Sequence, residues 1–135
     1  MKVYANKQGS PLDVKQEKGM HVTIYHNPRC SKSRETLALL EARGLTPDVV
    51  RYLETPPSIE VLKTLIRQLG FGSVRQLMRS KDELYQTLGM DNPQLDEEAL
   101  YHLLAEHPAL MERPIVVHGE QARLGRPPEQ VLEIL

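Results

Sequence analysis

The stretch that decides the fold spans residues 25–34 and reads Tyr-His-Asn-Pro-Arg-Cys-Ser-Lys-Ser-Arg. A short apolar run at residues 22–25 predicts a buried strand in front of it. Residues 35–43 have a helix-forming composition, and Gly44 predicts the end of that helix. Cys30, the single cysteine, is therefore expected in a strand-to-helix turn, at or just before the helix N-terminus.

This position favours a reactive thiol. The nucleophile is the thiolate, and an ordinary thiol with a pKa of about 8.5 is mostly protonated at neutral pH. Free backbone N–H groups at a helix start favour an anion, and Arg29, Lys32 and Arg34 add positive charge. The alternative is a buried, inert cysteine, which normally lies among apolar residues. Serine and charged residues follow this one instead.

Composition narrows the class of protein. A length of 135 residues predicts one domain, and an apolar content of 40% suffices for an ordinary core. A formal net charge of -1 gives no reason to expect binding to nucleic acid or to a membrane. One cysteine excludes an intramolecular disulfide and fits a reducing, cytoplasmic setting. Any redox cycle must then take its second thiol from outside the chain.

The chain divides into two unequal parts. Residues 1–19 are polar, with Gly9-Ser10-Pro11 in the middle and no sustained periodicity, so we expect a flexible leader or an artificial extension ahead of Met20. Residues 20–135 are expected to form the folded domain.

The remaining patterns predict alternating strands and helices. In order they are a strand at 48–53, helices at 59–69, 73–79, 84–88 and 97–106, strands at 114–118 and 122–124, and a helix at 131–134. Ser58, Ser73 and Asp96 are the predicted N-caps of three of these helices, and Pro127-Pro128-Glu129 is the predicted start of the last one. A strand-helix-strand unit requires parallel pairing with a right-handed crossover, and the later hairpin adds antiparallel strands. The prediction is an α/β, thioredoxin-like fold: a four-stranded mixed sheet flanked by helices, with a helical insertion between strands two and three.

Two neighbours of the cysteine each allow two interpretations. Ser33 completes a Cys-x-x-Ser arrangement, in which its hydroxyl either donates to the thiolate or belongs to an ordinary helix start. It forms no disulfide, so an external thiol must regenerate Cys30. His26 either lowers the thiol pKa as an imidazolium or simply ends the first strand. No histidine spacing indicates a metal site.

Three arginines outside the loop are the second feature. Arg79, Arg113 and Arg126 carry guanidinium forks, which match phosphate-like oxyanions, although surface arginines are more often merely solvated. In the predicted topology the start of the third strand lies beside the first helical turn, which places Arg113 near Cys30. Pro114 enters that strand, where this fold often has a cis peptide, and a cis Arg113-Pro114 bond is predicted.

Several blocks together resemble a known family. Residues 24–34, 52–57, 113–117 and 126–127 are similar, in order, to the glutaredoxin-coupled arsenate reductase family. The resemblance extends from about Met20 to Leu135. It implies that Cys30 is catalytic and that Arg79, Arg113 and Arg126 bind the oxyanion. His26, Ser33, Arg34 and Pro114 would support the site.

The resemblance also implies a reaction cycle. Cys30 would attack arsenate or a similar oxyanion, glutathione would act as co-substrate, and glutaredoxin would resolve the mixed disulfide. No bound cofactor is expected. Well-studied arsenate-reducing members carry Ala and Gly-Thr where this chain has Arg29 and Ser31-Lys32, so the chain resembles a paralogous branch. Two alternatives remain: a glutaredoxin-like deglutathionylase, or an Spx-like regulator that binds RNA polymerase, although such regulators typically carry Cys-x-x-Cys.

Overall fold

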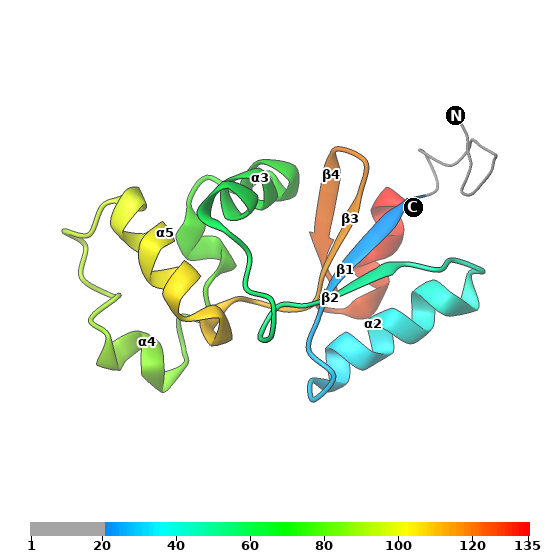
Figure 1. The fold of residues 1–135 in the computed structure, drawn as a ribbon, viewed down its shortest axis with the longest axis horizontal. Helices are drawn as coiled ribbons and strands as arrows, with labels where there is room; N and C mark the ends of the chain where they lie inside the picture. Colours follow the sequence, from blue (N-terminus) through cyan, green and yellow to red (C-terminus); the bar gives the residue numbers. More distant parts are fainter. Residues whose placement is uncertain (1–20) are drawn as a thin grey trace.

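A four-stranded mixed sheet organises the protein, as the computed structural model of residues 21–135 shows (Figure 1). Its strands are β1 (Val22–His26), β2 (Asp48–Arg51), β3 (Ile115–His118) and β4 (Gln121–Leu124), in the order β2-β1-β3-β4. β1 pairs with β2 in parallel, whereas β3 is antiparallel to both β1 and β4. The predicted thioredoxin-like topology is confirmed.

The two faces of the sheet are covered by different elements. Side chains alternate along a strand, so Val22 and Ile24 pack with Val116 against α2 (Ser31–Ala42) and η3 (Pro128–Ile134). Tyr25 and Val117 contact the other core cluster, which includes residues of α3 (Ile59–Leu69). The sheet is therefore flanked on both sides, as predicted.

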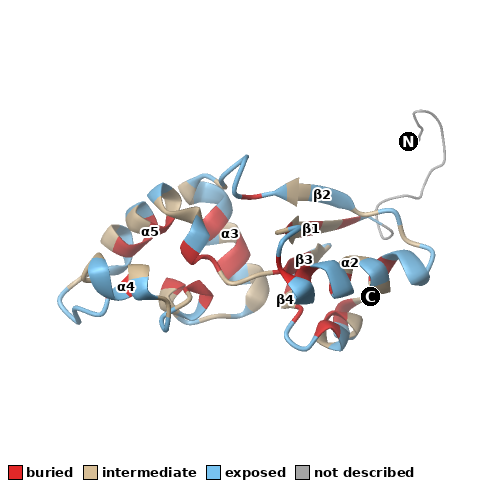
Figure 2. Ribbon diagram, turned by 90° about the horizontal axis from the view of Figure 1, so that it is seen from below, coloured by how far each residue is buried: buried red, intermediate tan, exposed pale blue. Residues whose placement is uncertain are grey.

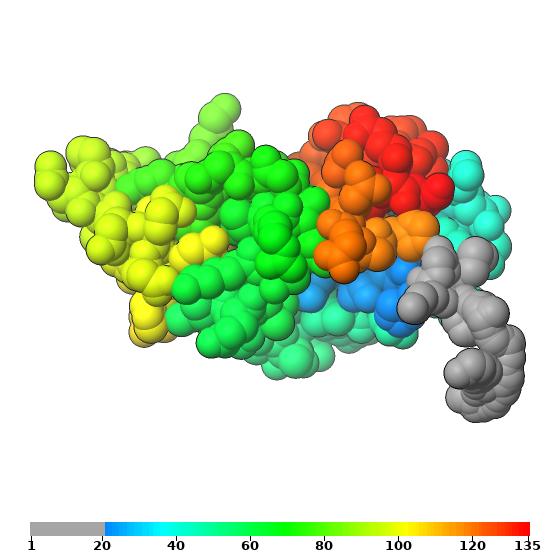
Figure 3. Space-filling model, turned by 90° about the horizontal axis from the view of Figure 1, so that it is seen from above, coloured from blue at the N-terminus to red at the C-terminus, as the bar shows by residue number. Residues whose placement is uncertain are grey.

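The insertion between β2 and β3 forms a lobe of its own. It contains α3, η1 (Val74–Leu77), α4 (Glu83–Thr87), α5 (Glu97–Glu106) and η2 (Pro108–Leu110). This segment lies at one end of the molecule, with the sheet and α2 at the other (green to yellow in Figures 1 and 3; labelled α3, α4 and α5 in Figure 2). The predicted caps are present: Ser58 Oγ accepts from Val61 N at 3.2 Å and Asp96 Oδ1 from Ala99 N at 2.9 Å.

Several predicted boundaries were wrong. Strand β2 ends at Arg51, so residues 52–53, predicted as part of the strand, lie in a turn. The predicted helix at 73–79 is one 3₁₀ turn, because Met78 leaves it to pair with Met111. The terminal helix begins at Pro128, within the predicted Pro127-Pro128-Glu129 start, but it is also of the 3₁₀ type. Tertiary pairing and proline override helix propensity in such short segments.

Two X-Pro bonds are cis. The Arg113-Pro114 bond confirms the prediction, whereas the cis Arg126-Pro127 bond was not predicted. The leader expected at residues 1–19 lies outside the described residues. Within residues 21–135, no helix combines the length and the apolar character that crossing a membrane requires.

Candidate active site

Cys30 occupies the N-cap position of α2, as the sequence predicted. Its backbone is extended, with φ -95° and ψ 124°. Its N–H donates to Asn27 O at 3.0 Å, and its carbonyl accepts from Arg34 N at 3.0 Å. The residue is 8% exposed, yet it belongs to neither hydrophobic core cluster. This setting differs from that of an inert core cysteine.

The surroundings of the sulfur favour the thiolate. Burial raises the pKa of Cys30, but the backbone N–H groups of Ser33 and Lys32 together with the charges of Arg113 and Arg126 outweigh it, so the net pKa is lowered. Arg126 Nη2 lies 3.6 Å from Sγ. A helix start and two guanidinium groups thus act on the same sulfur.

For Ser33 and His26 the structure favours the second of the two interpretations: neither side chain acts on the sulfur directly. The Ser33 hydroxyl accepts from Asn27 N at 3.0 Å and lies 2.6 Å from His26 Nδ1. It is committed to these groups, and it is the Ser33 backbone N–H that bonds the sulfur. Burial, with the charges of Arg51 and Arg34, lowers the pKa of His26. A neutral imidazole that ends β1 therefore replaces the imidazolium alternative.

Arg34 supports the loop rather than the sulfur. Its Nη1 donates to Pro28 O at 3.0 Å, which closes the turn between β1 and α2. Its backbone N–H makes the first helical bond, to the Cys30 carbonyl. The Arg34 side chain therefore stabilises the turn that carries Cys30.

The β3–β4 hairpin brings Arg113 and Arg126 together. Ile115 pairs with Leu124, so the residues just before β3 and just after β4 are neighbours. Gly125 N donates to Pro114 O at 3.0 Å, and Arg126 Nε donates to Arg113 O at 2.8 Å. Antiparallel pairing thus explains why two arginines that are distant in sequence meet beside Cys30.

Arg79 reaches the same place from the insertion. The Met78–Met111 bridge is flanked by two backbone bonds of 2.7 Å, from Arg79 N to Leu110 O and from Glu112 N to Leu77 O. This pairing places Arg79 alongside the segment that leads into β3. Its guanidinium forms an ion pair with Asp82 at 3.1 Å.

The three arginines line one polar cavity of about 390 Å³, and Cys30 adjoins it through Arg126. Its lining residues are Arg79, Ser80, Lys81, Asp82, Glu112, Arg113 and Arg126. Within the described chain, Nε and Nη1 of Arg113 are buried without any hydrogen-bond partner. Buried donors are costly when unsatisfied, so they favour a ligand that supplies oxygen acceptors. The three predicted arginines therefore converge.

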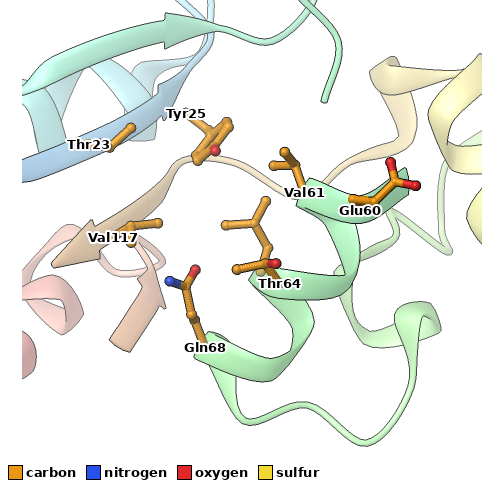
Figure 4. Close-up of a pocket in the computed structure, with 8 residues that line it drawn as sticks. Thr23, Tyr25, Glu60, Val61, Thr64, Gln68 and Val117 are labelled. Carbon is orange, nitrogen blue, oxygen red and sulfur yellow. The ribbon is translucent and has the colours of Figure 1, made fainter. Parts of the chain in front are cut away.

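A second cavity differs in position and chemistry (Figure 4). It has a volume of about 300 Å³ and lies between α3 and strands β1 and β3. Its lining residues are Thr23, Tyr25, Glu60, Val61, Thr64, Leu65, Gln68 and Val117. It contains neither the cysteine nor a cation, so it offers no nucleophile and no anion site.

Two residues of the site, Asp82 and Asn27, were not predicted from the sequence. Asp82 lies three positions after Arg79, a spacing that could have indicated an ion pair. Asn27 holds the turn through its backbone and also accepts from Arg29 N at 2.9 Å through Oδ1. Within residues 21–135, no group of three His, Cys, Asp or Glu side chains could hold a metal ion.

The geometry defines a thioredoxin-like protein with one activated thiol beside an arginine-lined cavity. The ArsC family model matches residues 25–134, and the chain belongs to the ArsC family. It is 54% identical over 116 residues to an arsenate reductase of Haemophilus influenzae, covering 86% of this chain and all of that protein. It is 57% identical over 114 residues to the uncharacterised Escherichia coli protein YfgD, covering 84% and 96%.

A solved structure shows the same fold. An arsenate reductase from Vibrio cholerae matches with a TM-score of 0.85 and 62% identity, covering 87% of this chain and 99% of that one. The architecture and its ArsC membership are thus supported by sequence and by structure.

Proposed function

We propose that the protein is a glutathione- and glutaredoxin-dependent arsenate reductase that uses Cys30 as its only nucleophile. The observation that carries the proposal is Arg113, which lines the polar cavity, has two buried donors without a partner and helps to lower the pKa of Cys30. A tetrahedral oxyanion would satisfy those donors and present its central atom to the thiolate. The arsenate reductases among its relatives support arsenate as that oxyanion.

The first step forms a sulfur–arsenic bond. The Cys30 thiolate attacks arsenate, and one oxygen leaves as water after taking up protons from solvent. Arg79, Arg113 and Arg126 offset the charge on the remaining oxygens, and such pre-positioned donors are typically worth about 10²–10³-fold in rate each. The backbone N–H groups of Ser33 and Lys32 stabilise the attacking thiolate, and Arg126, which lines the cavity, lies 3.6 Å from its sulfur.

The second step reduces arsenic. A glutathione thiolate attacks the Cys30 sulfur, the sulfur–arsenic bond breaks, and its electron pair stays on arsenic, which leaves as arsenite. The product on the protein is a mixed disulfide between Cys30 and glutathione. A glutaredoxin thiol then attacks the glutathione sulfur and releases the Cys30 thiolate. Because Ser33 replaces a second cysteine, the chain has no internal thiol for this step.

The test is arsenite formation from arsenate with glutathione and glutaredoxin. We expect turnover with the wild type, and none above background with Cys30→Ser, because serine is not ionised at neutral pH. Omitting glutaredoxin should leave at most one equivalent of arsenite and a protein whose mass is raised by one glutathione.

Two outcomes would contradict the proposal. Absence of arsenite, with rapid removal of glutathione from a glutathionylated peptide, would indicate the deglutathionylase alternative. Absence of both activities, with co-purification of RNA polymerase, would indicate a regulator.

A Ser31→Ala variant is the matched control for Cys30→Ser, because Ser31 is exposed at the same helix start.

A further inference from the structure

Glu112 is an acidic side chain in a cavity that otherwise suits anions. Seven residues line this cavity, of which four are cationic, two are acidic and one is a serine. The acidic residues are Asp82 and Glu112. A carboxylate repels an anion, and the proposed cycle gives Glu112 no role.

The two carboxylates differ in what they bind. Asp82 Oδ2 accepts from Arg79 Nη1 at 3.1 Å, and Asp82 Oδ1 accepts from Leu84 N at 2.9 Å. Both oxygens of Asp82 are thus engaged. The Glu112 carboxylate, in contrast, forms no hydrogen bond and no ion pair with any residue of the described range 21–135. Its oxygen atoms therefore remain available as acceptors for a ligand.

The backbone pairing of Met78 with Met111 sets the direction of the Glu112 side chain. Arg79 N and Glu112 N each donate across this pairing at 2.7 Å. Each of the two residues directly follows one of the paired methionines, which are both buried. Since side chains alternate along paired extended segments, Arg79 and Glu112 leave the pairing on the same face, opposite to the methionines. Accordingly, both residues line the cavity.

We propose that Glu112 is a specificity-determining residue: its carboxylate accepts a hydrogen bond from the hydroxyl of a protonated oxyanion and repels an oxyanion that carries no proton. The arginines bind the ionised oxygens of either kind of anion. An ionised carboxylate has acceptors only, so it pairs with an O–H group and not with a bare oxygen.

This difference divides the tetrahedral oxyanions into two classes. At neutral pH arsenate and phosphate retain at least one proton, whereas sulfate and selenate retain none. A carboxylate at the site thus acts as an attractive element for the first class and as a repulsive element for the second. We expect the cavity to select arsenate and phosphate against sulfate and selenate.

The test is the protection of Cys30 from iodoacetamide by phosphate and by sulfate. Arg126 lines the cavity and lies 3.6 Å from Sγ, so an anion bound there should slow alkylation. The anion concentration that halves the rate measures the affinity, at an ionic strength held constant with chloride. For the wild type, this concentration should be at least about tenfold lower for phosphate than for sulfate.

Glu112→Gln removes the charge and keeps the size of the side chain. Its amide can donate to a bare oxygen as well as accept from a hydroxyl. The half-protecting concentration of sulfate should therefore fall about tenfold, while that of phosphate should change by less than about threefold. Should circular dichroism show this variant to be unfolded, Glu112→Ala replaces it, and the preference for phosphate should fall there too.

Glu83→Gln is the matched control. Glu83 is exposed, directly follows Asp82 at the start of α4, and does not line the cavity. The substitution removes the same charge near the site, so a general change in electrostatic potential would affect both anions alike. Its preference for phosphate over sulfate should equal that of the wild type.

Three results would overturn the inference. They are the absence of a preference for phosphate in the wild type, an unchanged preference in the folded Glu112 variant, and an equal loss of preference in Glu83→Gln. The inference deepens the proposed function, but protection needs neither glutathione nor glutaredoxin. Arsenite formation with an unchanged preference would remove only the inference, whereas a lost preference without arsenite formation would remove only the proposed function.

Discussion

The two sides of the arginine-lined cavity are built differently. On the sheet side, Arg113 has two buried donors without a partner, and Arg126 contacts the sulfur itself. On the insertion side, Arg79 is already paired with Asp82. The sheet side is thus poised for an anion, whereas the insertion side is partly neutralised before any ligand arrives. In the proposed reaction we therefore expect the sheet side to bind and activate the oxyanion and the insertion side to adjust the charge of the cavity.

The contrast predicts unequal effects of removing the two arginines. Arg113→Ala should lower kcat/KM for arsenate by about 10²–10³-fold, since it removes the donors with no other use. Arg79→Ala should cost only about tenfold, because part of the charge of Arg79 is already offset. Steady-state kinetics with both variants provide the measurement. Equal losses would remove the distinction between the two sides.

A second prediction concerns the close approach that seats Arg126. A Cβ on Gly125 would overlap Thr36 Oγ1 and approach Pro114 Cγ to 2.8 Å. Gly125→Ala should therefore lower the free energy of unfolding by about 1–3 kcal/mol and reduce activity, because the segments before β3 and after β4 are pushed apart.

Gly72→Ala is the control for this change. A Cβ there meets only Gln76 Oε1, at 3.7 Å, which is an ordinary contact. Urea unfolding of both variants should show a loss only for Gly125→Ala. Equal stability of the two would mean that the hairpin ends adapt easily.

The ion pair on the insertion side can be tested by Asp82→Asn. Asparagine is as good an N-cap as aspartate, so α4 should keep its start, where Asp82 Oδ1 accepts from Leu84 N at 2.9 Å. Removing the carboxylate charge should free Arg79 for the ligand. We expect KM for arsenate and the inhibition constant for phosphate to fall about two- to fivefold, the effect of a partly exposed ion pair.

Asp96→Asn makes the same substitution at another cap, that of α5. It should leave both constants unchanged, because Asp96 does not line the cavity. A weaker affinity in Asp82→Asn would show instead that the carboxylate chiefly holds Arg79 in place.

The smallest expected effect is the dependence of the free energy of unfolding on pH through Cys30. The folded-state pKa of Cys30 is lowered, so between that pKa and the unfolded value of about 8.5 the unfolded chain binds more protons. The free energy of unfolding of the wild type, compared with that of the Cys30→Ser variant, should rise with pH through this window. The rise should be about 1.4 kcal/mol for each pH unit at most, and it should level off above the window. The gain should vanish as the pH falls through the folded pKa. Urea unfolding at several pH values measures it, and a flat difference would contradict the activated thiol.

Local patterns predicted much of this molecule because they report local physics. Three such patterns act within a few residues: the apolar run that becomes β1, the N-cap at Ser58 and the N-cap at Asp96. The structure contains the strand and both capping hydrogen bonds. The predictions failed where distant contacts decide. The segment after Ser73 leaves its helical turn because Met78 pairs with Met111, which is 33 positions further along (111 minus 78).

The amino-acid sequence alone determined the topology and the position of Cys30 at a helix start, because both follow from residue type and spacing. It also singled out the three arginines, through the resemblance to a known family. Only the tertiary structure decided that two nitrogens of Arg113 are left without a partner while Arg79 is paired, and that the Ser33 hydroxyl lies against His26. Hydrogen bonds and ion pairs join whichever groups the fold brings within reach, and no local pattern encodes that choice.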